Sequence, residues 1–380
     1  MKATTCGLFA IMLLWFFPAP ACSSYSYQDI NPSGWIESRA VCVNDQGDVA
    51  GYGNNGSGER GFLWSSGDVT EILPPGAASA RANWINGRGD VAGTAVIDGQ
   101  PHAFLYTGGM YVDPTPGWTY SEATHVGEDG SVTGTGEFGA FISRNGVPEL
   151  LPGFNTVVGA NASGQILGIS GGTARLFLPG TGYIILSPPG CSSVIPRGLN
   201  ESGLVAVSSR HSNTEKGYVY SGGFYVFMTP QGWTSSNAMG INNASQVAGY
   251  GDSPAGRRGF VRTGSTYEEL WFPGWNSTEA ISINESAQVA GSGETGSGET
   301  HAFLSSPVSA SAGESAGASS GGMGGGGGGC TVAGRDARGT FSCSSAANLL
   351  VLLFPLFILR HSCRKVRILD RHAGRDSRSR

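Results

Sequence analysis

The stretch INGRGDVAG at residues 85–93 recurs as INNASQVAG at residues 241–249 and as INESAQVAG at residues 283–291. Looser copies begin at Val43, Val126, Ala160 and Leu199, so the pattern occurs seven times. Counted at the second residue of each copy, the period is 34 to 42 residues. A period in this range is typical of solenoids, propellers and repeat arrays. The repeat therefore restricts the architecture before any single residue is considered.

Each copy contains the signals for four short strands, which we name A to D in chain order. Strand A ends at the Asn, and a Gly three residues later suits a tight hairpin into strand B, which carries the VAG run. Ser245 and Ala287 replace that Gly in the last two copies, so looser turns are expected there. Strand C carries an aromatic residue, and a second Gly-rich turn leads into strand D. Four strands per period predict a β-propeller blade.

The two ends of the repeat region complement each other. Residues 25–30 have the pattern of a strand D, whereas residues 301–306 form a strand C that lacks its strand D. We expect these segments to pair and to close an all-β, seven-bladed propeller over residues 25–308, which removes open sheet edges. A β-solenoid is the main alternative, but it has a shorter rung and does not explain the complementary ends.

The HAFL strings at residues 102–105 and 301–304, together with the I-N-x-x-G-x-V-x-G runs, resemble the HAF-repeat family of bacterial extracellular proteins. The resemblance covers about residues 25–306. It implies an exported, propeller-like repeat protein and carries no known reaction, so it assigns no catalytic residue to this chain.

The N-terminus has the pattern of an export signal. Lys2, an apolar run at residues 7–17 and the small residues before Ala21 predict a secretory signal peptide over residues 1–21, with cleavage after Ala21. Cys22 then becomes the first residue, which leaves a lipoprotein as an alternative.

The C-terminus has the pattern of a membrane address. A Ser/Ala/Gly-rich linker over residues 309–340 precedes a predicted hydrophobic helix over residues 341–359 and a basic tail over residues 360–380. The positive-inside rule places this tail in the cytoplasm. The order of linker, Cys330, apolar segment and basic tail resembles the GlyGly-CTERM and MYXO-CTERM sorting signals, which implies a temporary anchor removed near Cys330. A permanent single-pass anchor is the alternative, and both place the protein at the cell surface or outside the cell.

Charge and cysteine content exclude several classes of partner and framework. The chain has 23 Lys and Arg against 28 Asp and Glu, and most of the tail's charges are basic, so the exported body is strongly acidic. Such a surface gains nothing from phosphate neutralisation, which argues against nucleic acid binding. Within the ring only Cys42 and Cys191 remain, in distant blades, so both thiols are expected to be free. The sequence contains no metal, phosphate-loop or nucleophile motif, and no cofactor is expected.

The candidate binding residues share one face of the ring, the loop-rich face, which carries the B–C loops and the D–A connections between blades. Aromatic residues recur in the connections, and a basic residue recurs at the start of strand C. Arg175 and Lys216 oppose Ile185 and Phe227 instead of acids, so they are candidate free cations. The candidate ligand-binding set is Trp35, Trp118, Trp233, Trp275, Arg175 and Lys216.

Two interpretations of this set stay open. In the structural one, each Trp fastens one blade to the next, and each base pairs with an acid on strand D. In the functional one, the face binds sugars or anionic polymers through ring stacking and cations.

The sequence thus predicts a monomeric, exported, seven-bladed propeller that acts as a surface-displayed binding or structural module and not as an enzyme. Its expected partners are the membrane, through the C-terminal helix, and a carbohydrate or protein ligand at the loop-rich face. The alternative is an extracellular propeller hydrolase or lyase acting on polysaccharide, with acid/base residues among Asp98, His211, Glu215 and Asp252.

Overall fold

The computed structural model describes residues 25–308, and this region is entirely β. The predicted signal peptide with Ala21, the linker with Cys330, the hydrophobic helix and the basic tail all lie outside the described residues. Within residues 25–308 there is no helix of the length and apolarity needed to cross a membrane.

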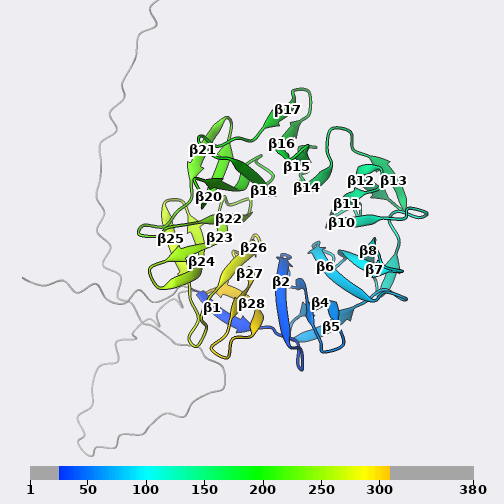
Figure 1. Cartoon of the computed structure of the whole chain (residues 1–380), viewed down its shortest axis with the longest axis horizontal. Helices are drawn as coiled ribbons and strands as arrows, with labels where there is room; N and C mark the ends of the chain where they lie inside the picture. Colours follow the sequence, from blue (N-terminus) through cyan, green and yellow to red (C-terminus); the bar gives the residue numbers. More distant parts are fainter. Residues whose placement is uncertain (1–24, 309–380) are drawn as a thin grey trace, which may run out of the picture. The chain divides into compact units, whose positions relative to one another are not determined.

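Seven four-stranded antiparallel sheets are arranged around a centre, as the sequence predicted (Figure 1). Blades 1 and 2 consist of β2 (Glu37–Val43), β3 (Val49–Asn54), β4 (Glu59–Ser65), β5 (Asp68–Ile72), β6 (Ser79–Ile85), β7 (Val91–Ile97), β8 (Gln100–Thr107) and β9 (Met110–Val112). Blades 3 and 4 consist of β10 (Ser121–Val126), β11 (Val132–Gly136), β12 (Gly139–Arg144), β13 (Val147–Leu150), β14 (Thr156–Ala160), β15 (Ile166–Ser170), β16 (Thr173–Leu178) and β17 (Gly182–Ile185). Blades 5 and 6 consist of β18 (Ser193–Leu199), β19 (Val205–His211), β20 (Thr214–Ser221), β21 (Phe224–Phe227), β22 (Asn237–Ile241), β23 (Val247–Ser253), β24 (Gly256–Thr263) and β25 (Thr266–Leu270).

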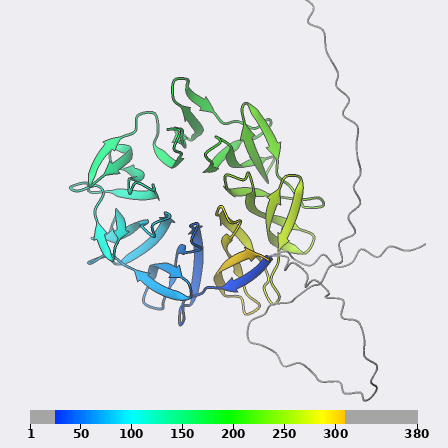
Figure 2. The ribbon, with the colours of Figure 1, turned by 180° about the vertical axis from the view of Figure 1, so that it is seen from behind.

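Blade 7 joins the two ends of the described chain, which confirms the predicted closure. It consists of β26 (Glu279–Ile283), β27 (Val289–Glu294), β28 (Thr300–Pro307) and, from the N-terminal end, β1 (Tyr25–Asp29). The register pairs Tyr25 with Pro307 and Asp29 with Phe303. Figure 2 shows the two ends side by side in the same blade when the ring is seen from behind. The closure leaves blade 7 with the same four-stranded order as the other blades.

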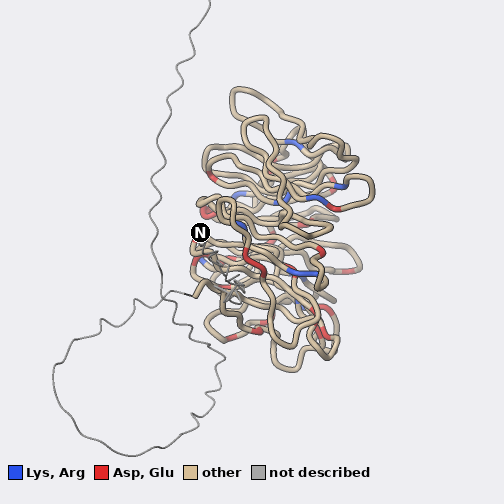
Figure 3. Tube along the Cα trace, turned by 90° about the vertical axis from the view of Figure 1, so that its left-hand side faces the viewer, with Lys and Arg blue, Asp and Glu red and all other residues tan. Residues whose placement is uncertain are grey.

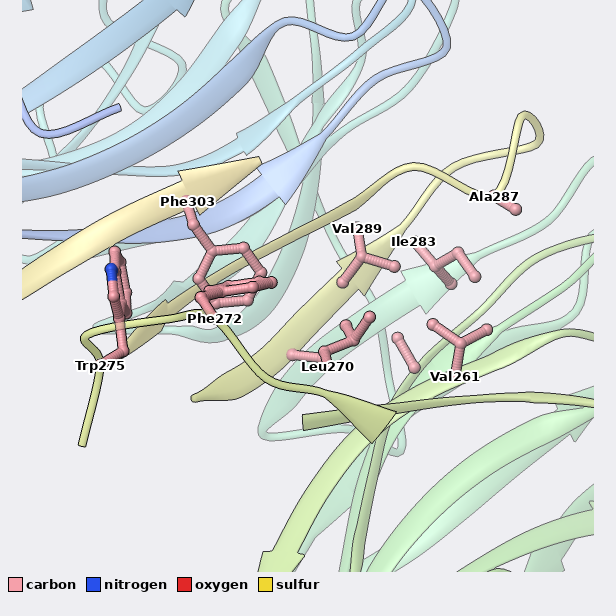
Figure 4. Close-up of a cluster of buried hydrophobic side chains, with 10 residues drawn as sticks. Val261, Leu270, Phe272, Trp275, Ile283, Ala287, Val289 and Phe303 are labelled. Carbon is pink, nitrogen blue, oxygen red and sulfur yellow. The ribbon is translucent and has the colours of Figure 1, made fainter. Parts of the chain in front are cut away.

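The core lies between adjacent blades. In one cluster Val261 and Leu270 of blade 6 pack with Ile283, Val289 and Phe303 of blade 7 (Figure 4). In blade 7, strand B has a Gly opposite the strand C aromatic, because a Cβ on Gly291 would lie 2.6 Å from the Phe303 ring. The VAG run therefore keeps a side-chain-free position under a fully buried Phe.

The A–B turns explain the Asn of the repeat more fully than turn capping alone. In each turn that has the Asn, its side-chain nitrogen donates to the carbonyl of the corresponding residue in the next blade, at 2.7–3.1 Å. The donors are Asn44, Asn86, Asn161, Asn200, Asn242 and Asn284. Gly127 holds this position in blade 3, so the link from blade 3 to blade 4 is missing from the ring of hydrogen bonds.

The last two A–B turns are not looser, contrary to the expectation from their sequence. Ser245 and Ala287 adopt φ of 62° and 59°. Their N–H groups donate to the main-chain carbonyl oxygens of Asn242 and Asn284, at 3.0 and 3.1 Å. The Asn side chain, which also accepts from Gln246 N and Gln288 N, holds each turn closed. The missing Gly therefore leaves an unfavourable left-handed residue in each turn without loosening it.

Candidate functional site

The loop-rich face forms where strands A and C begin and strands B and D end. Acidic and basic residues are spread along the ring in the side view (Figure 3). The described residues contain no group of three or more His, Cys, Asp and Glu side chains placed to hold a metal ion. Cys42 and Cys191 are both free, as expected from their separation in the ring.

The four predicted Trp residues occupy one recurrent position and lie in blades 1, 3, 6 and 7. Each ring makes an edge contact with the strand C Phe of its own blade, at 5.4–6.0 Å between centroids. Trp275 is buried, and the other three are half-buried. Gly53, Gly136 and Gly293 on strand B leave room for the rings of Trp35, Trp118 and Trp275. The geometry therefore distributes the Trp residues around the ring instead of gathering them into one site.

Lys216 takes part in a repeated contact between blades. Its Nζ lies 3.3 Å from the Thr234 carbonyl in the connection to blade 6, and 5.3 Å from the centre of the Phe227 ring. Arg60 and Arg258 donate in the same way to Ala78 O at 3.0 Å and Asn276 O at 2.7 Å. Lys216 thus links its blade to the next connection, as the corresponding arginines do.

The expected pairing of the other strand C bases with strand D acids is largely present. Arg60 lies 3.5 Å from Glu71, Arg258 lies 3.6 Å from Glu269, and His301 lies 2.7 Å from Asp29 across the closure. His102 forms no such pair among the described residues.

Arg175 stands elsewhere in its blade than the sequence repeat indicated. Gly168 pairs with Arg175 in the same register in which Gly51 pairs with Phe62, so Arg175 occupies the position of the strand C aromatic. Thr173 holds the position expected for the base. The tight turn at Gly171 and Gly172 shortens the B–C hairpin, which displaces the repeat by two residues.

Phe154 fills the space that the strand C ring occupies in other blades, because it lies against Gly168 and belongs to the core between blades 3 and 4. Arg175 donates to Gly153 O at 3.5 Å, and its buried Nε has no hydrogen-bond partner.

A charged cavity that the sequence did not point to lies at the start of the inner strand of blade 1. It has a volume of about 110 Å³ and is lined by Glu37, Arg39, Tyr52, Gly53, Asn54 and Glu59. Arg81 of blade 2 donates to both carboxylate oxygens of Glu59, at 2.8 and 2.7 Å, and its guanidinium carbon lies 4.5 Å from the centre of the Tyr52 ring. The hydrogen bond with Glu59 is the main cause that raises the pKa of Arg81. We call the residues that line this cavity, together with Arg81, the blade 1 mouth.

Blades 5 to 7 carry a related arrangement with the charges exchanged. Arg257 on strand C of blade 6 lies 2.9 Å from Glu279 of blade 7 and 5.1 Å from the centre of the Tyr250 ring. It also lies 3.4 Å from Asp252 and 3.7 Å from Glu215 of blade 5. Both arrangements place an Arg on a Tyr of strand B at the join between two blades.

Burial shifts two groups of this second arrangement. It raises the pKa of Tyr250, and the carboxylates of Glu279 and Glu215 raise it further. Burial also lowers the pKa of Arg197, whose buried Nε has no hydrogen-bond partner. A half-buried Arg with spare donor capacity therefore stands near these acids.

The residues proposed for an enzyme are partly brought together. Glu215 and Asp252 meet at Arg257, so both carboxylates are paired with one cation. Among the other titratable residues, His125 packs on Trp84 at 4.5 Å between ring centres. Burial lowers the pKa of His125 to about 4, so the ring is neutral at pH 7. The ion pairs of Arg257 with Glu215 and Asp252 are suited to holding polar ligand groups.

Comparisons with known proteins support the fold and leave the activity open. No family model matches the chain, and no curated protein matches it. The β-propeller domain of the Trilobed protease from Pyrococcus furiosus, with an open velcro topology, has a TM-score of 0.51 and 9% identity over 71% of this chain and 93% of that one. A structure of YCF48 bound to D1 peptide has a TM-score of 0.50 and 12% identity over 77% and 99%.

A streptogramin B lyase structure has a TM-score of 0.48 and 14% identity, over 74% of this chain and 97% of that chain. At 9% and 12% identity, the likeness to the protease domain and to YCF48 concerns the fold alone.

The strand A and strand B residues of the blade 1 mouth were not predicted, because the pairing of each strand C base with an acid points outward to strand D. The signal was present in the residue just before that base, which is Glu59, Glu215 or Arg257 in three copies where other copies have Pro101 or Phe138. A charge at that place meets strand A of the next blade.

Proposed function

We propose that this protein is an exported, surface-displayed binding module without catalytic activity, and that it binds polysaccharide at the loop-rich face. The observation that carries the proposal is the blade 1 mouth, in which a bidentate Arg81–Glu59 pair stands on Tyr52 beside a cavity. Planar polar groups next to an aromatic ring suit a ligand rich in hydroxyls, because carboxylates accept and guanidinium groups donate.

The predicted Trp and cationic residues take different parts in this proposal. Trp35 adjoins the mouth, because its ring lies against Gly53, which lines the cavity. It is therefore the Trp of the predicted set that is best placed to contact ligand. Trp118, Trp233, Trp275 and Lys216 support the face through contacts within and between blades.

The proposed address rests on the sequence alone. A signal peptide, the resemblance to HAF-repeat proteins and a C-terminal anchor that is cut near Cys330 or retained are together consistent with a cell-surface protein. Mass spectrometry of protein recovered from cells tests this, since an intact basic tail in the soluble secreted fraction would contradict both forms of anchoring.

A glycan array with the purified full-length chain tests the binding proposal. We expect saturable retention of polysaccharide fragments, weakened about tenfold or more by Arg81→Ala and by Tyr52→Ala, which is the effect of removing one central contact. Arg88→Ala is the matched control, because Arg88 is exposed like Arg81 and pairs with a carboxylate, that of the buried Asp90, at 2.7 Å in an A–B turn. The proposal is wrong if no glycan is retained, or if the control weakens retention as much as the mouth variants do. Release of shortened glycan in the same wells would favour the hydrolase or lyase instead.

A further inference from the structure

The outer strands carry a recurrent tyrosine that seals the wedge between neighbouring blades. Tyr111 accepts a hydrogen bond from Leu73 N at 2.9 Å, and Tyr225 accepts one from Ser187 N at 2.7 Å. Tyr183 donates to Pro152 O at 2.7 Å, and the Tyr27 ring stacks on Phe272 at 4.2 Å. In each case the ring belongs to strand D of one blade, and its partner lies in the connection arriving from the preceding blade.

Blade 1 lacks this tyrosine. The ladder between strands C and D pairs Val69 with Trp64 in the same register in which Tyr111 pairs with Tyr106 and Tyr225 pairs with Tyr220. Pro148 and Tyr267 hold this position in blades 3 and 6. At Val69, the smaller side chain leaves the wedge to the arriving connection unfilled.

A cavity of about 540 Å³ is present at that place. Its walls include Ile30, Asn31, Trp35, Trp64 and Val69. This volume is within the range of pockets that hold small molecules or a few side chains. The cavity lies between the closing strand β1 with its connection and the outer hairpin of blade 1, so the N-terminal end of the ring closure contributes to it.

The cavity offers hydrogen-bond acceptors and negative charge, so it suits a ligand that carries hydrogen-bond donors. The side-chain oxygen of Asn31 is buried and has no hydrogen-bond partner, although its nitrogen donates to Trp35 O at 3.3 Å. Buried acceptors are rarely left unpaired. The charged lining residues are Asp29, Asp68 and Glu71, and all are acids. Asp29 and Glu71 already face His301 and Arg60, whereas Asp68 is exposed and forms no ion pair within residues 25–308.

We propose that this wedge is a binding site for a hydroxyphenyl ring that carries a nearby cationic group. The ring takes the place that the protein's own tyrosine fills in blades 2, 4, 5 and 7, and its hydroxyl donates to the unpaired Asn31 oxygen. The cation lies at the acidic rim near Asp68. A small aromatic amine and a tyrosine side chain in a basic polypeptide segment both have this chemistry. The site adjoins the blade 1 mouth at Trp35 but shares none of the residues that line the mouth, and it does not depend on polysaccharide binding.

Calorimetric titration of the full-length chain with tyramine and with the blocked peptide Lys-Tyr-Lys tests the proposal and separates the two sources. Saturable binding of tyramine is expected, and a peptide affinity at least tenfold higher would identify a polypeptide as the natural ligand. Phenethylamine, which lacks the hydroxyl, should bind about tenfold more weakly because the Asn31 oxygen stays unpaired. The anion 4-hydroxyphenylacetate should not bind, because the rim is acidic.

Val69→Tyr restores the tyrosine of the repeat and is the decisive variant. It should remove the binding of both probes and should melt at or above the temperature of the parent, because it fills a cavity. Tyr111→Val is the matched control, since it removes the wedge tyrosine from blade 2 and should leave the blade 1 site unchanged.

Should Val69→Tyr fail to fold, Asp68→Asn decides, with an expected loss of about fivefold in tyramine affinity. The proposal is overturned if the parent binds neither probe. It is also overturned if the folded Val69→Tyr protein, or in its absence Asp68→Asn, binds tyramine as the parent does.

Discussion

At the scale of single residues, the same position in the repeat can hold a packing residue or a polar one, and its neighbours change with it. Phe62 fills the centre of its blade, whereas Arg175 stands at the same register in blade 4 and leaves the space to Phe154. Val69 stands where four other blades have a wedge tyrosine that contacts the arriving connection. Departures from the repeat are therefore compensated locally or leave an opening.

Trp118, Trp233 and Trp275 are predicted to stabilise the fold more than they bind ligand. Trp118 packs edge-on against Phe138 and Phe141, at 5.1 and 5.4 Å between ring centres. Trp118→Ala should therefore lower the free energy of unfolding by about 3 kcal/mol, as large core truncations do. Urea melts of the variant measure this loss.

The control for Trp118 is Trp271→Ala, because Trp271 is 49% exposed on another connection. This change should cost under about 0.5 kcal/mol. A loss for Trp118→Ala as small as that of the control would return Trp118 to the list of ligand platforms.

At the scale of elements, the A–B turns link neighbouring blades through the Asn of the repeat. Each such side chain accepts hydrogen bonds within its own turn and donates to the carbonyl of the next turn. A short hairpin thereby contributes to packing between blades, because the groups it pairs are buried. Blade 3 has Gly127 instead, and the Asp129 side chain accepts from Ser131 N and Oγ to hold that turn.

Loss of one link in this ring should be costly. Asn242→Ala removes the contact with Asn284 O at 3.0 Å and leaves the N–H of Gln246 without its side-chain acceptor. We expect a loss of about 2 to 3 kcal/mol in the free energy of unfolding, measured by denaturant melts. Asn243→Ala removes only an exposed contact, in which Asn243 Oδ1 accepts from Glu201 N at 2.9 Å, and should cost less than about 1 kcal/mol because water can replace it. Equal losses for the two variants would mean that the ring of turn contacts does not stabilise the propeller.

At the scale of the whole molecule, closure determines both stability and the wedge cavity. Strand β1 pairs with β28 over five residues and continues into the connection that forms one wall of that cavity. The propeller is therefore closed by the same segment that shapes the site proposed for a hydroxyphenyl ring with a nearby cationic group.

Deleting residues 25–30 should leave blade 7 with three strands and expose the edge of β28. We expect a clear fall in the melting temperature and a tendency to associate, because an unpaired apolar edge recruits other strands. Calorimetry and size-exclusion chromatography measure these two effects. A deletion variant that melts within a degree or two of the parent and stays monomeric would contradict closure as a source of stability.

The sequence by itself determined the number of blades, the order of strands in each blade and the closure of the ring. These follow from the repeat period and from the complementary ends, which depend on local turns and on alternation within one blade. It also placed Trp35, Trp118, Trp233, Trp275 and Lys216 on the recurrent positions where the structure has them. The sequence did not predict the displacement of Arg175, because the packing of a blade decides a two-residue change in hairpin length.

Only the tertiary structure decided which side chains meet. The blade 1 mouth joins Glu59 to Arg81 across two blades, and the wedge cavity joins residues near Asn31 to residues near Val69. Contacts of this kind are made between blades, by residues on strands that pair with other partners within their own sheets. Their geometry depends on how each blade packs against the next, and the repeat pattern, which describes one blade at a time, contains no information about it.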